Sequence, residues 1–145
     1  MEDWKIEDLE VGIFSEPETP YGHARMTKEE YISWMRKKTK QASVEVINWM
    51  EREGKSPALN VIRYQLIKSA TSTGANYRAA CIARSKKEFF AKISIVCEEC
   101  DETLFWLEVL HDSDLPLNRE RLTRIGKEFR EIYKLVSKAR KTAHG

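Results

Sequence analysis

The feature that most constrains the fold of this chain is the helical spacing of its apolar residues, which continues through almost everything after residue 26. In four successive segments they recur three, four or seven positions apart, the period of one face of an α-helix. Segments of about 25 residues would form helices roughly 38 Å long. The predicted inner positions are Ile32, Met35, Ala42, Val46 and Trp49, then Leu59, Ile62, Leu66, Ala70, Thr73, Tyr77 and Ala80, then Phe89, Ile93, Val96, Cys100, Leu104, Leu107 and Leu110, and finally Leu122, Ile125, Phe129, Ile132, Val136 and Ala139.

Capping residues mark the ends of these segments. The predicted N-caps are Thr27, Ser56, Ser85 and Asn118. Thr27 and Ser85 each have a glutamate three residues later, which makes a capping box, and a proline follows Ser56 at the first helical position. Gly54 fits a C-cap of the first helix. Because the connections are short, consecutive helices must be antiparallel neighbours. We therefore predict an all-α fold, an antiparallel up-down four-helix bundle over residues 26–145.

Residues 1–25 do not continue this pattern and are predicted to form an extended N-terminal arm. Pro17 and Pro20 keep the stretch SEPETPYGH extended, because proline restricts its own backbone and that of the residue before it. The arm also carries apolar residues, among them Trp4 and Ile6. We expect it to dock on its own bundle or on a neighbouring subunit; the alternative is a disordered tail.

The sequence shows no targeting or membrane signal. Its start, MEDWKIEDLEV, is acidic and lacks the basic and then apolar plan of a secretory signal. No run of about 18 apolar residues is present, so no membrane span is predicted. We therefore expect a cytoplasmic protein. The three cysteines, Cys81, Cys97 and Cys100, are an odd number in a chain without such a signal, which favours reduced thiols.

Charge is segregated along the chain although the net charge is only +2. Residues 55–87 carry seven bases and no acid, and residues 117–145 carry nine bases against three acids. Residues 1–20 carry seven acids against one base, and residues 88–116 carry eight acids against one base. Such blocks either pair oppositely charged helices within the fold or leave a basic face for a polyanion.

The stretch SATSTGANYRAACIARSKKEFF, Ser69 to Phe90, combines small hydroxylated residues with a basic second half. It lacks the GxxxxGK[ST] pattern of a phosphate-binding loop, and Gly74 falls within a helical pattern. A glycine inside a helix costs about 1 kcal/mol relative to alanine, so we expect a slim helix against which another helix packs closely. Gly126 is expected to serve the same purpose in the last helix.

Two short patterns resemble pieces of metal sites. Cys97 and Cys100 form a C-x-x-C, but a zinc site needs a second pair of ligands. Glu108 and His111 form the E-x-x-H of di-iron bundles, which needs a second such motif and inward carboxylates on the other helices. We therefore interpret the cysteines as core thiols and expect no metal and no other cofactor. No nucleophile lies beside a base in the sequence, so we expect no enzymatic activity.

Basic residues in the last helix recur at spacings of three and four beside the apolar face, with Tyr133 among them. Such a row is often only a solvated face. Here it adds to the basic half of the stretch above, so contacts with the phosphates of RNA or DNA are predicted, with little sequence preference. The candidate nucleic-acid-binding residues are Arg78, Arg84, Lys86, Lys87, Lys127, Arg130, Lys134, Lys138 and Lys141.

Ser69 to Leu110 resembles the signature of the four-helix-bundle proteins encoded in bacterial rRNA intervening sequences. The matching parts are Asn76-Tyr77-Arg78-Ala79, the hinge from Arg84 to Phe89, the apolar run from Ile93 to Val96, and Glu98/Glu99 through Trp106-Leu107. Ala79-Ala80-Cys81 stands where many members carry Ala-Glu-Gly, which indicates a divergent branch. The arm is not part of the pattern.

This resemblance implies a homopentamer of four-helix bundles without known enzymatic activity. A related group, the accessory proteins of diversity-generating retroelements, binds nucleic acid and a reverse transcriptase through basic surfaces. Three hypotheses follow: a homo-oligomer that binds RNA or DNA phosphates, a protein-interaction scaffold such as a reverse-transcriptase accessory whose acidic arm or third helix meets a basic partner, and, last, a metal or redox enzyme.

Overall fold

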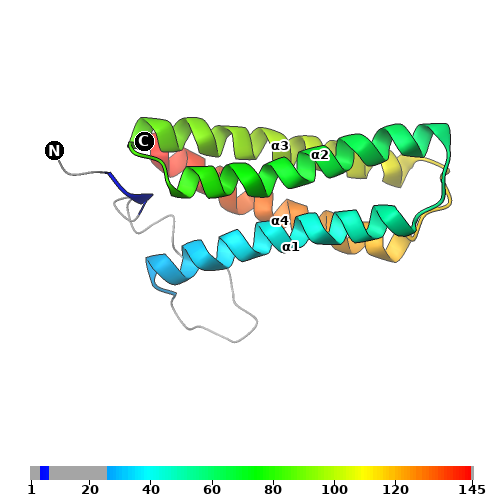
Figure 1. Ribbon diagram of the computed structural model, residues 1–145, viewed down its shortest axis with the longest axis horizontal. Helices are drawn as coiled ribbons and strands as arrows, with labels where there is room; N and C mark the ends of the chain where they lie inside the picture. The colour runs from blue at the N-terminus through cyan, green and yellow to red at the C-terminus, as the bar shows by residue number, and fades with distance from the viewer. Residues whose placement is uncertain (1–3, 7–25, 145) are drawn as a thin grey trace.

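Four long α-helices build the protein, and the predicted antiparallel four-helix bundle is confirmed. The computed structural model describes residues 4–6 and 26–144. Its helices are α1 (Lys28–Arg52), α2 (Pro57–Cys81), α3 (Lys86–Asp112) and α4 (Arg119–His144). Figure 1 shows the α1–α2 and α3–α4 connections at one end of the bundle, and the α2–α3 connection and the end of α4 at the other. None of these four helices is long and apolar enough to cross a membrane.

Each helix packs against two others, and α2 and α4 occupy opposite corners of the bundle. The predicted N-caps all form. Thr27, Ser56 and Ser85 accept a hydrogen bond through the hydroxyl, and Asn118 through Oδ1, from the backbone N–H three residues on, at 3.0–3.1 Å. The predicted cap at Gly54 is wrong: α1 ends at Arg52, and Glu53 leaves it in an extended conformation. The freedom of the glycine is not needed there, because the chain turns one residue earlier.

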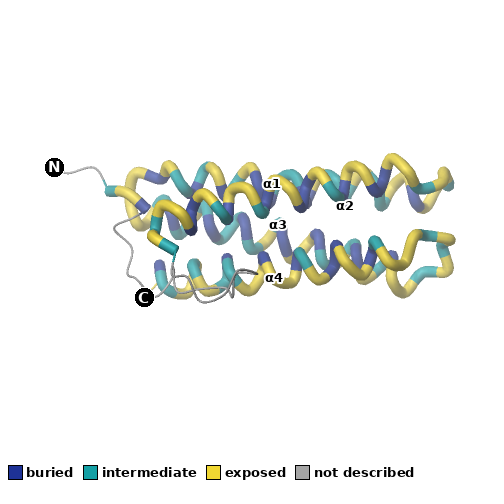
Figure 2. Tube along the Cα trace, turned by 90° about the horizontal axis from the view of Figure 1, so that it is seen from below, coloured by how far each residue is buried: buried dark blue, intermediate teal, exposed yellow. Residues whose placement is uncertain are grey.

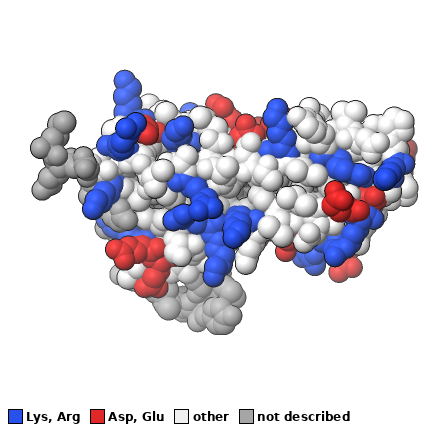
Figure 3. Space-filling model, viewed as in Figure 1, with Lys and Arg blue, Asp and Glu red and all other residues white. Residues whose placement is uncertain are grey.

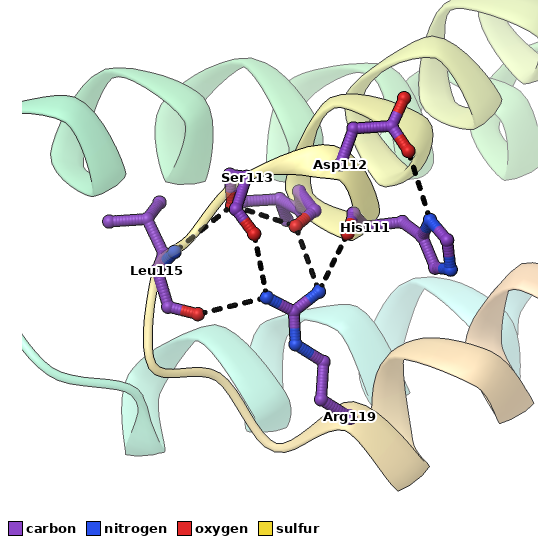
Figure 4. Close-up of polar contacts among 6 residues, drawn as sticks. His111, Asp112, Ser113, Leu115 and Arg119 are labelled. Carbon is purple, nitrogen blue, oxygen red and sulfur yellow. Dashed lines mark hydrogen bonds and ion pairs between the residues drawn. The ribbon is translucent and has the colours of Figure 1, made fainter.

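The α3–α4 connection depends on Arg119, whose role the sequence pattern did not predict. Its guanidinium donates hydrogen bonds to the carbonyl oxygens of Leu110, His111, Ser113 and Leu115 at 2.8–3.2 Å (Figure 4). The last carbonyls of a helix have no partner within it, so this side chain, together with the backbone N–H and hydroxyl of Ser113, satisfies the end of α3. A positive charge also suits the negative end of the helix dipole.

Burial follows the predicted apolar faces closely (Figure 2). Of the predicted inner positions, only Ile62, Leu104 and Ala139 are half-buried instead of buried. Hydroxyl side chains join the core as well, because each bonds to a backbone carbonyl of its own helix one turn earlier. The buried hydroxyl residues are Thr39, Ser43, Ser69, Thr73 and Thr103. Of these, the pattern predicted only Thr73.

Small and hydroxylated residues let α1 and α2 approach closely, as the stretch from Ser69 predicts. Ser43 Oγ of α1 donates to the carbonyl oxygen of Ala70 in α2 at 2.9 Å. A Cβ added at Gly74 would lie 3.4 Å from the carbonyl oxygen of Thr39. The expectation for Gly126 is wrong: a Cβ there would meet only the guanidinium of Arg130, at 3.8 Å, and no neighbouring helix.

A short N-terminal segment packs on the end of the bundle. Ile6 is only 4% exposed and shares a small apolar site with Tyr31 and Leu135, and the rings of Trp4 and Phe89 lie 5.8 Å apart. These contacts hold residues 4–6 against the chain's own helices. The rest of the predicted arm, and its extended shape, lie outside the described residues.

Cys100 is the thiol most firmly built into the core. All three cysteines, which lie within the described residues, carry reduced thiols without a disulfide between them. Cys100 is buried in α3, and its Sγ donates a hydrogen bond to the carbonyl oxygen of Phe129 in α4 at 3.4 Å. Burial disfavours the thiolate and raises the pKa of Cys100 from 9.0 to about 12. This thiol therefore serves packing rather than chemistry.

We predict that Gly74→Leu lowers the free energy of unfolding by about 1–3 kcal/mol, because the side chain must push α1 away. Gly74→Ala should be neutral or slightly stabilising, because its Cβ only reaches contact distance and alanine favours the helix. Gly126→Leu is the matched control and should cost little, because only the mobile end of Arg130 must move. Urea unfolding at fixed protein concentration measures all three. If the two leucine variants lost equal free energy of unfolding, the close packing of α1 on α2 at Gly74 would be contradicted.

We predict that alkaline pH destabilises the fold through Cys100. The folded-state pKa lies above the unfolded-state value of 9.0, so the contribution is complete below pH 9 and is lost as pH rises toward 12. In Cys100→Ser, whose hydroxyl does not ionise there, the free energy of unfolding should fall less steeply, by about 1.4 kcal/mol per pH unit. Urea unfolding between pH 8 and 11 gives both slopes, and parallel slopes would show that Cys100 ionises equally well in the folded protein.

Candidate nucleic-acid interface

The outward side of α4 carries a row of lysines. Lys127, Lys134 and Lys141 are exposed and lie seven residues apart, so they share one side of the helix, and Lys138 is exposed beside them. The carboxylates in the middle of α4 reach toward α1. Glu128 and Glu131 are within 2.8 and 3.2 Å of Lys38 on α1, whose side chain is only 11% exposed. Lys38 therefore engages these two carboxylates, although Glu131 stands between Lys127 and Lys134 and Glu120, in the first turn of α4, lies on the same side as the row.

The end of α4 meets the beginning of α3, and cationic and aromatic side chains gather there. Phe90 of α3 stacks on His144 of α4 with ring centroids 5.1 Å apart. The Arg140 guanidinium lies 5.3 Å from the centre of the Phe90 ring, and its Nε donates to Ser94 Oγ at 2.9 Å. We call the open cavity of about 450 Å³ at this place the terminal cleft; it is lined by Phe90, Cys97, Tyr133, Ser137, Arg140, Lys141 and His144.

The structure brings together some of the predicted residues but not all. Lys86 and Lys87 line a second cavity that shares Phe90 and His144 with the terminal cleft, so they join Lys141 at one end of the bundle. We call Lys86, Lys87, Lys127, Lys134, Lys138 and Lys141 the α4 surface.

Arg78 and Arg130 lie apart from the α4 surface, and Arg84, two residues before Lys86, is left out of it because it is paired with an acid. Arg84 forms an ion pair with Glu88 at 3.5 Å and remains largely exposed in the α2–α3 connection. Arg78 is exposed on α2, at the corner of the bundle opposite α4. The Arg130 guanidinium lies over Gly126 and lines a separate groove together with Glu108. An adjacent carboxylate makes that groove a poorer place for phosphate than the α4 surface.

A second basic region lies where α1 packs on α2, and the spacing of residues along the chain did not predict it. Arg36, Lys37 and Lys40 are exposed on α1. Burial raises the pKa of Tyr77 in α2, and the positive charge of Arg36 opposes this rise, so Arg36 lies beside the end of α2 that carries Arg78. Figure 3 shows Lys and Arg side chains gathered across the middle of this face. The run RKKTK, residues 36–40, is the sequence feature from which this region could have been predicted.

The sequence also gave no indication of Phe90, Arg140 and His144 as one site. Phe90 belongs to the apolar start of α3, whereas Arg140 and His144 lie about 50 residues further along the chain. Only the antiparallel packing of α3 on α4 brings them together. Because helical spacing describes one helix at a time, it cannot show which ends meet.

The acidic residues of α3 remain on its surface. Glu98, Asp101 and Glu102 are exposed, and among the described residues no ion pair joins them to α2 or α4. Partial burial, and then the nearby charge of Glu102, raises the pKa of Glu99. Within the described residues the acidic block forms no ion pair with the basic helices, although the charge of Lys68 in α2 opposes the rise in the pKa of Glu99. The ion pairs between described helices pass through Lys38 instead.

The residues considered for a metal site lie in different places. Cys97 lines the terminal cleft and Cys100 is in the core. Glu108 and His111 line the groove next to Gly126, but Nδ1 of His111 is 3.0 Å from Asp112 at the exposed end of α3, pointing away from Arg119 (Figure 4). Within residues 4–6 and 26–144, no three His, Cys, Asp or Glu side chains are placed to hold a metal ion.

Comparison with known proteins agrees with this architecture. A solved structure from Bacteroides thetaiotaomicron VPI-5482, described as a protein with unknown function from the S23 ribosomal protein family, is 29% identical to this chain, with a TM-score of 0.65. The match covers 76% of this chain and 97% of that one. No curated protein matches this chain.

The family comparison covers most of the bundle. Residues 22–138 match the family described as 23S rRNA-intervening sequence protein. The matched range contains α1, α2, α3 and most of α4, and it includes the motifs between Ser69 and Leu110. The chain belongs to the 23S rRNA-intervening sequence protein family.

Proposed function

We propose that this protein is a non-enzymatic homo-oligomer that binds the phosphates of RNA or DNA through the α4 surface. The observation that carries the proposal is that Lys38 of α1 engages the two carboxylates in the middle of α4. Glu128 and Glu131 are drawn toward Lys38, so they do not neutralise the lysine row on the outward side. Among the described residues no ion pair joins Lys127, Lys134 or Lys141 to an acid. A row of cations of this kind attracts a polyanion, whose condensed counterions are released on binding.

The spacing of the row suits a nucleic-acid backbone. Lys127, Lys134 and Lys141 are seven residues apart, so successive ammonium groups lie about 10 Å from each other along the helix. Lysine contacts to phosphate carry no sequence information, so the interaction is weakly specific. The family description names an RNA element, which makes RNA the first ligand to test.

Self-association would multiply this weak interaction. Four apolar side chains are exposed on the outer sides of α1 and α2, and we call them the α1–α2 patch: Val44, Ile47, Val61 and Tyr64. Exposed apolar groups concentrated on one face are typical of protein interfaces. We propose that a second copy of the chain covers this patch, and that the assembly is the pentamer implied by the resemblance. Five α4 surfaces on one particle would bind a polyanion with avidity.

A second candidate function is a protein-interaction scaffold, and the acidic side of α3 favours it. Glu98, Asp101 and Glu102 are exposed, and the charges of Glu102 and Glu98 add to burial in raising the pKa of Glu99, so like charges gather on this side. A basic partner, such as a reverse transcriptase, would relieve the repulsion among these carboxylates. Such an interaction is compatible with nucleic-acid binding at the α4 surface.

We predict that Lys127→Glu, Lys134→Glu and Lys141→Glu together weaken binding and lower its salt dependence. Three lost phosphate contacts should reduce the slope of log Kobs against log salt by about two to three. Fluorescence anisotropy with a labelled RNA across a salt series measures both effects. Circular dichroism verifies that the variant remains helical.

The matched control is the triple variant Arg36→Glu, Lys37→Glu and Lys40→Glu, which changes the net charge by the same amount on the other basic region. This control variant should retain most of the slope of log Kobs against log salt. If the control loses the slope while the α4 variant keeps it, the interface lies on α1 and α2 and the α4 surface is the wrong assignment.

We also predict that Ile47→Glu with Tyr64→Glu converts the oligomer to smaller species, because a buried charge in an interface lacks a partner. Ile82→Glu is the control, since Ile82 is 78% exposed but lies in the α2–α3 connection at the other end of the bundle. Sedimentation analysis gives the masses. A wild-type monomer at micromolar concentration, or a double variant of wild-type mass, would refute assembly through the α1–α2 patch.

A further inference from the structure

The terminal cleft has features that phosphate binding alone does not require. Three rings, those of Phe90, Tyr133 and His144, line it, and Tyr133 is 37% exposed. Its volume of about 450 Å³ lies within the range of small-molecule sites. We propose that the terminal cleft binds an unstacked nucleotide of a single-stranded nucleic acid, with the base on the aromatic side chains and the phosphate on the surrounding cations. This inference rests on the proposed function and narrows it to single strands.

The arrangement of the rings supports base stacking. Phe90 contacts His144 at 5.1 Å and the Arg140 guanidinium at 5.3 Å, so it forms a ready-made stack of flat groups. Arg140 is fixed in place by its bond to Ser94 Oγ. Bases in single strands stack on aromatic rings and on arginine planes of this kind. Because the stack exists without ligand, a base can extend it with little ordering of side chains.

The charges around the cleft select a phosphate. Arg140 and Lys141 line it, and Lys86 and Lys87 line the adjoining cavity around the same Phe90–His144 stack. Among residues 4–6 and 26–144, no acidic side chain lines either cavity. The groove at the other end of the α3–α4 interface includes Glu108 and Asp112, so it lacks this selectivity. The stacked rings suit the base of a nucleotide, and the cations beside them suit its phosphate.

Single strands should therefore bind better than duplexes. In a duplex each base is already stacked and paired, so a protein must extrude it before the cleft can hold it, and this costs free energy. A single strand presents unstacked bases at no such cost. The α4 surface leads to the cleft through Lys141, so one strand can contact the lysine row with its backbone and the cleft with one base.

Cys97 provides a reporter inside the cleft. It is half-buried and lines the cleft beside Ser137 and Arg140. Burial raises its pKa, whereas Ser137 and Arg140 act in the opposite direction. A nucleotide in the cleft should cover this thiol. Cys81, half-buried at the end of α2, serves as the internal reference.

The experiment compares a labelled single-stranded octanucleotide with its duplex, using the full chain. The wild type should bind the single strand more tightly. Phe90→Leu with Tyr133→Leu retains apolar bulk but removes both rings, and it should weaken single-strand binding about 5- to 100-fold, the value of a stacked base. The salt slope should remain, because the lysines are intact. Phe105→Leu removes an exposed ring from the same helix, about 22 Å away along its axis, and should change nothing.

Alkylation with N-ethylmaleimide at pH 8.5, followed by mass spectrometry of peptides, supplies the second readout. Saturating octanucleotide should slow the modification of Cys97 several-fold relative to Cys81. Equal binding of single strand and duplex, unchanged binding by the Phe90/Tyr133 variant, or an unprotected Cys97 would each overturn the cleft assignment while leaving the α4 surface in place. A wild type that binds neither probe at low salt would overturn the cleft and the proposed function together.

Discussion

The rotation of α4 about its own axis determines most of what this protein presents to its surroundings. Burial of the apolar side of α4, with Phe129 and Val136 at its centre, fixes that rotation, because turning the helix would expose this side to water. Glu128 and Glu131 then fall beside α1 and meet Lys38, whereas the lysine row faces outward. The same rotation brings His144 onto Phe90. Packing in the core thus sets the electrostatics of the surface.

The helices could be predicted from sequence because each carries its own information. Caps such as Thr27 and Ser56 and the repeated apolar spacing are local features, and the structure confirms them. Apart from the cap at Gly54, the predictions that failed depended on neighbouring helices. Gly126 has the same lack of a side chain as Gly74, yet only Gly74 faces another helix. Arg119 completes the end of α3 from the next helix, which no pattern within one helix reveals.

Only the part of the candidate interface that lies along one helix could be predicted, again because the sequence pattern describes one helix at a time. Rows such as Lys127, Lys134 and Lys141 are visible as spacing along one helix. To group residues from different helices, one must know which helices are neighbours in the bundle. Arg78 was grouped with the last helix from sequence alone, although α2 and α4 lie diagonally across the bundle. The terminal cleft joins residues from α3 and α4, so it emerges only with the fold. Membership of the 23S rRNA-intervening sequence protein family supports the architecture and leaves these surfaces to be tested.

The most direct test of the account measures how wild-type binding to a short RNA depends on salt, with the mass of the protein determined on the same sample. The account predicts an oligomer whose affinity falls steeply and log-linearly with salt, at a slope that counts the phosphates neutralised. Absence of binding at low salt by a properly assembled protein would contradict it. The lysine row would then serve only solubility or assembly.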